Sequence, residues 1–394
     1  MTLYRSEQRR LIEMMYGAAA PDYSLLLESF GNFLEKEILP SARKIDEERT
    51  FPQENLSKVF AQGLTAMAFP SQYGGLGLPF PIYVAAMEML GGCCGSTAIS
   101  AAIHGTTCGG IEKFGSEKQK EEYLAPMLAG SKLGAFTLTE PHSGSDAGAL
   151  ETRAEKDGDC FVLNGSKIFI SNGGKADVYF VFAKSADGPC AFIVDKGVPG
   201  LRFGKNMPKL GLRGSTLTEV FFEDCRIPAP SLVGREGQGF EYAKQMLHGG
   251  RITIGALSVG IAQMALEKSV QYSRSRVTFG SPLSQKQMIR EKLADMSASV
   301  SAARGLTYYA AWLRQRGLDY SREAAEAKLF ASETAVMVCD QAIQIHGGYG
   351  YTDDLDIHRH WRDARLMTIG EGTSEVMKLV ISSRLFQAAS YPTA

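Results

Sequence analysis

The hydrophobic periodicity of this 394-residue chain changes twice, and this alternation limits the folds that the chain can adopt. From about Tyr23 to Leu128, apolar residues recur at three- and four-residue steps, as on one face of a helix. Between about Leu133 and Phe240, short runs of Val, Ile, Phe and Tyr alternate with turn signals, which predicts strands. Helical periodicity returns from Glu241. We therefore predict an α+β fold in which helical domains flank a β domain.

The same changes of periodicity set the expected domain boundaries. We expect an N-terminal extension (residues 1–22), an N-terminal α domain (residues 23–132), a middle β domain (residues 133–240) and a C-terminal helical bundle (residues 241–394). More than one domain is expected, because a single hydrophobic core rarely serves more than roughly 250–300 residues. No apolar run reaches the roughly 18 residues of a membrane-spanning helix, so we expect no membrane partner.

The middle domain is predicted to be an antiparallel β-barrel or sandwich, because its strands follow one another without intervening helices. We expect a tight hairpin at Asn164-Gly165, between strands at Phe161–Leu163 and Ile168–Ile170, since both turn residues tolerate positive φ. A further pair of strands, Val178–Ala183 and Ala191–Val194, is separated by another turn signal.

The C-terminal domain is predicted to be a four-helix bundle. Its helical segments are expected to end near glycines or loop signals at Gly250, Phe279, Gly317 and Gly347.

Composition excludes several classes of partner. Lys and Arg total 42 against 43 Asp and Glu, so no net field favours nucleic acid or an anionic membrane. The seven cysteines contain no C-x-x-C pair, which favours reduced, mostly buried thiols in the cytoplasm, or in the mitochondrial matrix if the source is eukaryotic.

The chemical motifs of common enzyme classes are absent or weak. No G-x-G-x-x-G follows a strand, so a Rossmann site has no support. His358 and His360 are two residues apart and would point to different faces of a helix, so we expect surface roles and no metal site. Ser143 and Ser145 do not form a nucleophile elbow.

Four separated segments are specific when taken together. They are Thr139–Asp146 (TEPHSGSD), Phe169–Gly173 (FISNG), Arg276–Gly280 (RVTFG) and Glu371–Glu375 (EGTSE). In this order, on an α–β–α chain, they resemble the acyl-CoA dehydrogenase family over about residues 23 to 390, as do Gln344–Gly348 and Phe222–Pro228. The resemblance implies an enzyme with FAD as its cofactor.

By resemblance, one set of residues binds the flavin of its own chain. Phe136, Leu138 and Thr139 would touch the isoalloxazine ring, Phe169 would lie against its face and Ser171 would bond its N5 edge. The resemblance also assigns Ser145, Thr373 and Glu375 to the cofactor. An aromatic neighbour suits a flat ring, and polar donors around N5 tune hydride acceptance. Without the resemblance, Phe169 and Ser171 would be interpreted as parts of an ordinary strand.

A second set is expected to contact the FAD of a neighbouring subunit, which implies a homotetramer built as a dimer of dimers. This set is Arg276, Thr278, Phe279, Gln287, Gln344, Gly347 and Gly348. A guanidinium suits pyrophosphate because its fork of donors matches the anion. The alternative interpretations are a surface arginine and a helix C-cap at the glycines.

The resemblance makes Glu371 the catalytic base. It would remove a proton from Cα of an acyl-CoA thioester, while flavin N5 takes a hydride from Cβ and an electron-transferring flavoprotein later accepts the electrons. The family stabilises the developing enolate with the backbone N–H at this position and a ribityl hydroxyl. Burial should raise the pKa of the carboxyl. The simpler alternative is a first-turn acidic residue that answers the dipole of a helix capped by Thr373 or Ser374.

The expected substrate site departs from the family in two places. Some members carry the base directly before the residue that matches Arg251, but Gly250 stands there, so Glu371 has no rival. His248 replaces an Asp that many members have, which leaves an acyl carrier protein open as an alternative to CoA. The predicted substrate-binding residues are Ser145, His248, Arg251, Gly370 and Gly372.

The acyl group is the least constrained part of the prediction. Gly370 stands where a Tyr often precedes the base, so we expect an open pocket and a branched or cyclic acyl group. The Ser96–Ile99 region lacks the Arg of glutaryl-specific members, which disfavours glutaryl-CoA. Two alternatives stay open: an acyl-CoA oxidase, and a flavin-containing DNA-associated protein of the same fold.

Overall fold

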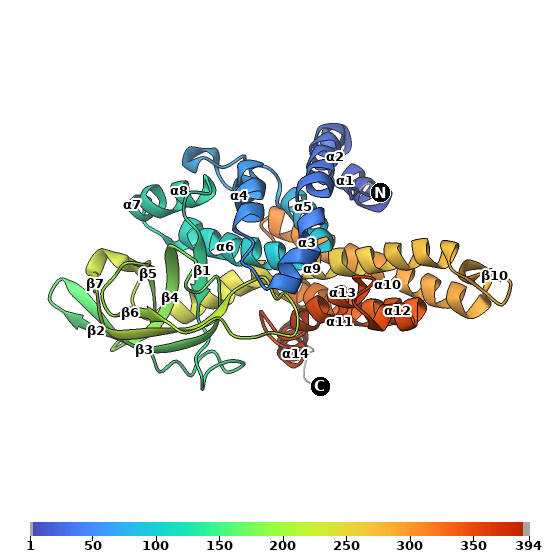
Figure 1. The fold of residues 1–394 in the computed structure, drawn as a ribbon. Helices are drawn as coiled ribbons and strands as arrows, with labels where there is room; N and C mark the ends of the chain where they lie inside the picture. Colours follow the sequence, from blue (N-terminus) through green and yellow to red (C-terminus); the bar gives the residue numbers. More distant parts are fainter. Residues whose placement is uncertain (1–2, 389–394) are drawn as a thin grey trace, which may run out of the picture.

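The computed structural model describes residues 3–388, which form two helical regions and, at one end of the molecule, a sheet that lies between them in the sequence (Figure 1). The first region holds α1 (Ser6–Tyr16), α2 (Ala20–Glu37), α3 (Ala42–Glu48), α4 (Gln53–Ala61), α5 (Phe80–Cys93), α6 (Gly95–Phe114), α7 (Glu117–Gln119) and α8 (Ala125–Leu128). The predicted α+β architecture is confirmed.

The sheet region carries eight strands of one sheet. They are β1 (Gly134–Thr137), β2 (Arg153–Asp157), β3 (Cys160–Ser171), β4 (Val178–Ser185), β5 (Gly188–Asp195), β6 (Leu201–Phe203), β7 (Leu217–Pro228) and β8 (Leu232–Val233). The order is β6-β7-β3-β2-β4-β5-β8, and β1 pairs with β4. Neighbours are antiparallel except that β1 and β2 each run parallel to β4. The sheet is therefore mixed, although mainly antiparallel as predicted.

The C-terminal region is a helical bundle with a short hairpin at one end. It contains α9 (Gly239–Ser275), β9 (Val277–Thr278), β10 (Ser281–Pro282), α10 (Gln287–Gln315), α11 (Ser321–His346), α12 (Gly348–Tyr351), α13 (Ile357–Met367) and α14 (Ser374–Ala388). Figure 1 shows α9 and α10 extending together to β10, at the opposite end of the molecule from the sheet. Of the helices described, none is both long and apolar enough to cross a bilayer.

The hairpin predicted at Asn164-Gly165 is wrong. Both residues lie inside β3, which pairs with β7 across this point with a shift of register between Leu163 and Gly165. Gly165 has φ +145°, and a Cβ on it would lie 2.7 Å from the Cα of Thr152. The glycine therefore serves a β-bulge and a close strand contact rather than a turn. The strands predicted at Val178–Ala183 and Ala191–Val194 are present within β4 and β5, which pair antiparallel.

The helix end predicted near Gly250 is also wrong. This residue lies inside α9, which has 37 residues and continues past it without a break. Glycine weakens a helix by about 1 kcal/mol relative to alanine, and this cost does not stop a long buried helix whose packing holds it together. The ends predicted near Phe279, Gly317 and Gly347 are confirmed by α9, α10 and α11.

The surface position predicted for both histidines of α13 is wrong for His360. That side chain is 1% exposed, and burial holds the pKa of its imidazole well below the ordinary value. His358 points outward and bonds Asp353 at 3.0 Å. Within the described residues no group of three or more His, Cys, Asp or Glu is placed to hold a metal. All seven cysteines are free and six are buried, as predicted.

A buried ion pair joins the helices of the two regions. Arg304 on α10 donates to Glu88 on α5 at 2.9 Å, and both side chains are buried. The Tyr308 hydroxyl donates to the same carboxylate at 3.1 Å, and the Gln263 amide oxygen on α9 accepts from Arg304 at 2.7 Å. Such a pair is well satisfied, but losing one partner leaves the other charged and desolvated.

We predict that Glu88→Gln lowers the thermal midpoint by several degrees, because removing one partner of a buried pair costs about 3 kcal/mol or more. Circular dichroism of the purified variant measures the change. Asp157→Asn is the matched control, since it breaks the exposed pair with Arg226 and should leave the midpoint unchanged. Equal midpoints for Glu88→Gln and the wild type would contradict the prediction.

Candidate active site

Glu371 lies in a tight turn between α13 and α14. Its φ is +56°, an uncommon value for a residue with a side chain, and Gly372 follows with φ +97°. The hydroxyl of Thr373 accepts a hydrogen bond from Val376 N–H at 3.3 Å and so caps α14. Of the two predicted caps, Thr373 is the one used, because the Ser374 hydroxyl instead donates to Glu333 on α11. Backbone conformation and cap together aim the Glu371 side chain.

The carboxylate of Glu371 lies against the helix α9 at Gly250. A Cβ on Gly250 would lie 2.6 Å from Glu371 Oε2, which is closer than van der Waals contact allows, so the carboxylate would have to move. The glycine that interrupts the helical pattern therefore provides the space that the carboxylate occupies. Gly250 and Glu371, the two positions compared as places for a base in the sequence analysis, therefore face one location.

Some polar atoms at this carboxylate are buried and lack a partner among residues 3–388. They are Oε2 of Glu371 and Nε and Nη1 of Arg251, a side chain that is 6% exposed. Buried polar atoms normally have partners, so this cluster is suited to a polar ligand. Burial raises the pKa of Glu371 to about 7, opposed by the positive charges of Arg251 and Lys328. A carboxylate of that basicity suits proton abstraction near neutral pH.

His248 lies one helical turn before Arg251 on α9. Burial, with the charges of Arg251 and Arg384, lowers its pKa to about 4, so the imidazole is neutral at pH 7. Its ring stands edge-on to Tyr320, with the centroids 6.3 Å apart. At the position where the resemblance led us to expect an Asp, this site therefore has a neutral imidazole ring in place of a negative charge.

The residues predicted to touch the flavin ring gather at the junction of β1 and β3. Phe136 is in β1, Leu138 is buried and the carbonyl of Thr139 accepts from Ile168 N–H at 2.9 Å. Phe169 has φ +57° at an irregularity in the β3–β7 pairing, and its ring is 57% exposed. The bulge therefore turns a large aromatic ring outward, as a stacking partner for a flat ligand requires. Ser171 ends β3.

Three residues that fix this junction were not assigned roles from the sequence. Lys167 is fully buried and its ammonium group donates to Glu140 at 2.7 Å and to the carbonyl of Leu138 at 3.1 Å. The amide of Asn172 donates to the carbonyls of Ser100 and Gly134 at 2.9 and 3.0 Å. Glu140 and Asn172 lie inside two of the four segments quoted in the sequence analysis. Membership of these segments was the signal from which a structural role for the two residues could have been predicted.

A second cluster forms at the far end of the bundle. Arg276, Thr278, Gly347 and Gly348 line one pocket of about 520 Å³, and the Arg276 guanidinium lies over the Tyr349 ring at 5.8 Å. Phe279, also predicted here, is 97% exposed on the adjoining hairpin. Gln287 and Gln344 are exposed and do not line this pocket.

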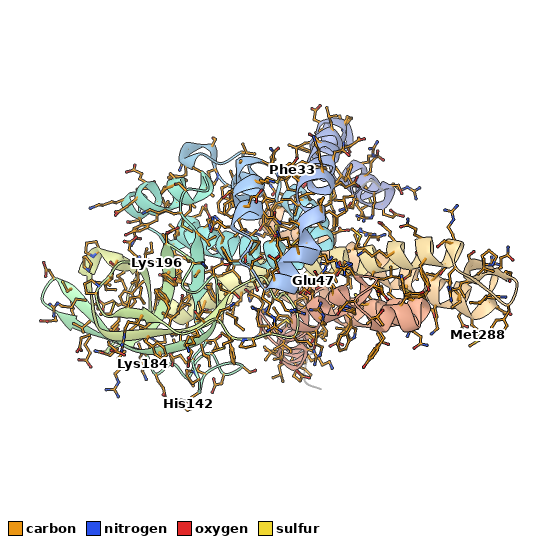
Figure 2. The ribbon with its side chains drawn as sticks, in the orientation of Figure 1. Phe33, Glu47, His142, Lys184, Lys196 and Met288 are labelled. Atoms are coloured by element: carbon orange, nitrogen blue, oxygen red, sulfur yellow. The ribbon has the colours of Figure 1, made fainter. Side chains whose placement is uncertain are left out.

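The two predicted cofactor sets lie apart in one chain. Figure 1 shows β3 in the sheet at one end of the molecule and β10 at the other. In Figure 2, Met288, next to Gln287, lies at the far end of the helical arm, whereas His142, in the loop after Thr139, lies beneath the sheet. Ser145 is exposed in that same loop, and Glu375 is exposed in the first turn of α14.

Comparisons with known proteins identify the family of this chain. Models of the N-terminal, middle and C-terminal domains of acyl-CoA dehydrogenases match residues 20–131, 135–225 and 237–386. The short-chain specific acyl-CoA dehydrogenase of Clostridium acetobutylicum is 43% identical over 372 residues, which are 93% of this chain and 98% of that protein.

Two solved structures are similar over nearly the whole chain. Butyryl-CoA dehydrogenase from Megasphaera elsdenii has a TM-score of 0.91 and 40% identity, covering 92% of this chain and 98% of that one. A chain in the structure of the electron transferring flavoprotein of Acidaminococcus fermentans has a TM-score of 0.92 and 42% identity, covering 93% and 98%. The chain belongs to the acyl-CoA dehydrogenase family, a family of FAD-dependent oxidoreductases.

Proposed function

We propose that this protein converts a short acyl-CoA thioester to its trans-2-enoyl thioester, with Glu371 as the base, and passes the electrons to an electron-transferring flavoprotein. The observation that carries the proposal is the Glu371 carboxylate, which is buried, unpaired and of raised pKa beside an unpaired arginine. The short-chain name of one relative and the flavoprotein structure that holds a similar chain support the substrate class and the acceptor.

The reaction breaks one C–H bond at Cα and one at Cβ and forms a double bond between the two carbons. Glu371 in its ionised form takes the Cα hydrogen as a proton. The FAD, when bound, supplies the hydride acceptor for Cβ. The exposed ring of Phe169 and the polar end of β3 at Ser171 provide an apolar face and a donor edge that fit an isoalloxazine ring. Loss of the Cα proton is favoured by N–H donors at the thioester oxygen, and the backbone N–H of Glu371 is our candidate.

Arg251 is proposed to contribute positive charge beside the reacting thioester. Its guanidinium is buried, and the surroundings lower its pKa chiefly through desolvation. An unpaired buried cation lowers the free energy of a developing negative charge more strongly than an exposed one, because the local dielectric is low. The other predicted substrate contacts remain predictions: Ser145, His248, Gly370 and Gly372.

We propose further that the FAD site is completed by a second copy of the chain within a homotetramer. One chain holds the ring-binding residues of β1 and β3 at one end and the Arg276 pocket at the other (Figure 1). A guanidinium, exposed glycine backbone and an aromatic ring fit a pyrophosphate and its neighbouring groups. An antiparallel association of two chains would bring the two ends together.

We predict that Glu371→Gln keeps the fold and the bound FAD but reduces the flavin about a thousandfold more slowly or worse, because removing a general base costs typically 10²–10⁴-fold. Anaerobic stopped-flow bleaching of the flavin by butyryl-CoA measures this rate. Glu375→Gln, in the exposed first turn of the next helix, changes the same group outside the buried turn and should reduce the flavin far faster than Glu371→Gln. Near-normal bleaching in Glu371→Gln would disprove the assignment.

We predict that Gly250→Ala lowers the flavin reduction rate by about a hundredfold, because displacing a catalytic group by about 1 Å has this effect. Its new methyl group would overlap the carboxylate of Glu371. Gly305→Ala on α10 is the matched control, since nothing lies within 4 Å of the added Cβ. Both substitutions favour a helix, so thermal melting should show no loss of stability in the control while stopped-flow bleaching separates the two variants. Equal flavin reduction rates in Gly250→Ala and Gly305→Ala would refute the proposed effect of the contact between Gly250 and the Glu371 carboxylate.

The acyl group can be tested separately from the chemistry. The absence of a side chain at Gly370 leads us to propose a compact branched or cyclic acyl group in addition to short straight chains. We predict that isobutyryl-CoA or cyclohexanecarbonyl-CoA bleaches the flavin at least as fast as butyryl-CoA, and that Gly370→Tyr removes this tolerance by filling the space. A clear preference of the wild type for butyryl-CoA would count against the branched assignment.

A further inference from the structure

Lys328 is a buried lysine that the proposed reaction does not use. It lies on α11 with no exposed surface, and its ammonium group donates to the carbonyl oxygen of Gly372 at 2.6 Å. Burying a lysine is unfavourable unless its charge has a use or a partner. No ion pair ties it to a carboxylate within residues 3–388. Its one strong contact is therefore with the turn that carries Glu371.

That turn has a backbone that needs support. Glu371 and Gly372 both have positive φ, and only the glycine adopts such values without strain. The helix α11 holds the segment at two points, through Lys328 to the Gly372 carbonyl and through Glu333 to the Ser374 hydroxyl. Both bonds lie within three positions of Glu371, on its C-terminal side, so α11 anchors the turn directly after the residue that is proposed to move the proton.

The charges around the turn come from three helices. The helix α9 contributes Arg251, α11 contributes Lys328 and Glu333, and α14 contributes Glu375. Burial lowers the pKa of Lys328 to about 8, while Glu371, Glu333 and Glu375 act in the opposite direction, so the ammonium group is charged at pH 7. Glu333 is engaged with Ser374 and Glu375 is exposed. Arg251 and Lys328 are thus the two cations that favour the ionised form of Glu371.

We propose that Lys328 is a positioning residue for Glu371: it fixes the strained turn through the Gly372 carbonyl, and its charge favours the ionised form of the carboxylate. This inference rests on the proposed role of Glu371 as the base. The two effects act through different parts of the lysine, because the hydrogen bond needs a donor whereas the electrostatic effect needs a charge.

Two substitutions separate these effects. Lys328→Gln keeps an N–H donor near the Gly372 carbonyl and removes the charge, while Lys328→Met removes both. Lys268→Met is the matched control, because this lysine on α9 also has a pKa lowered to about 8 by burial but is paired with Asp356. For each FAD-loaded protein, the rate of flavin reduction by butyryl-CoA is measured from pH 5.5 to 9. Hydrogen exchange of the 369–376 segment is followed by mass spectrometry.

The wild-type rate is expected to rise with pH through about 7, as Glu371 loses its proton. Without the cation the pKa of Glu371 rises further, so the midpoint moves to higher pH by about one unit in both Lys328 variants. The rate well below the midpoint then falls about tenfold. Exchange of the 369–376 segment increases in Lys328→Met and much less in Lys328→Gln. Lys268→Met keeps the wild-type midpoint.

Midpoints equal to that of the wild type in Lys328→Gln would overturn the proposal, whether or not Lys328→Met folds. Loss of soluble protein in both Lys328 variants but not in Lys268→Met would also overturn it, since the lysine would then serve the packing of α11. Failure of the proposed function is a separate result, because rapid bleaching in Glu371→Gln would remove the base without reference to Lys328.

Discussion

The continuity of α9 is the constraint on which the rest of this structure depends. A helix of 37 residues extends about 55 Å, and this one passes from the sheet to the far hairpin through the middle of the molecule. At one end it presents Gly250 and Arg251 to the turn of Glu371, and at the other it ends at Arg276. The buried Glu88–Arg304 pair and Gln263 fix it against α5 and α10. The packing of one helix therefore determines where two separate clusters lie.

Burial then gives the Glu371 carboxylate its chemical character. Desolvation alone would favour a neutral carboxyl, and the charges of Arg251 and Lys328 limit that effect. Because neither cation forms an ion pair with it in the described residues, the carboxylate keeps its lone pairs free. A tighter pair would stabilise the ionised form but weaken it as a base. The balance between burial and distant charge is what a proton abstraction near neutral pH requires.

Much of the fold follows from periodicity, whereas local geometry does not. The alternation of helical and strand patterns predicted the three regions, and the four quoted segments predicted the family. Two of the errors arose where glycine has more than one use, and the third was the surface position predicted for the buried His360. Asn164-Gly165 is typical of a turn, yet the bulge at this point depends on the pairing of β3 with β7, a strand more than 50 residues later in the chain. Gly250 is typical of a helix end, yet its structural role depends on its contact with the carboxylate of Glu371, which lies 121 positions later in the chain. Lys167 and Lys328 gave no signal, because buried lysines have no pattern of their own.

The contact between Gly250 and Glu371 also limits how such an enzyme can evolve. A side chain at position 250 would enter the space that the Glu371 carboxylate fills, so carboxylates at both positions would crowd one another. The two single substitutions lead either to a site with two crowded carboxylates or to a site with none. With Glu371 as the proposed base, moving that role from the turn to the helix would therefore require passage through an impaired intermediate.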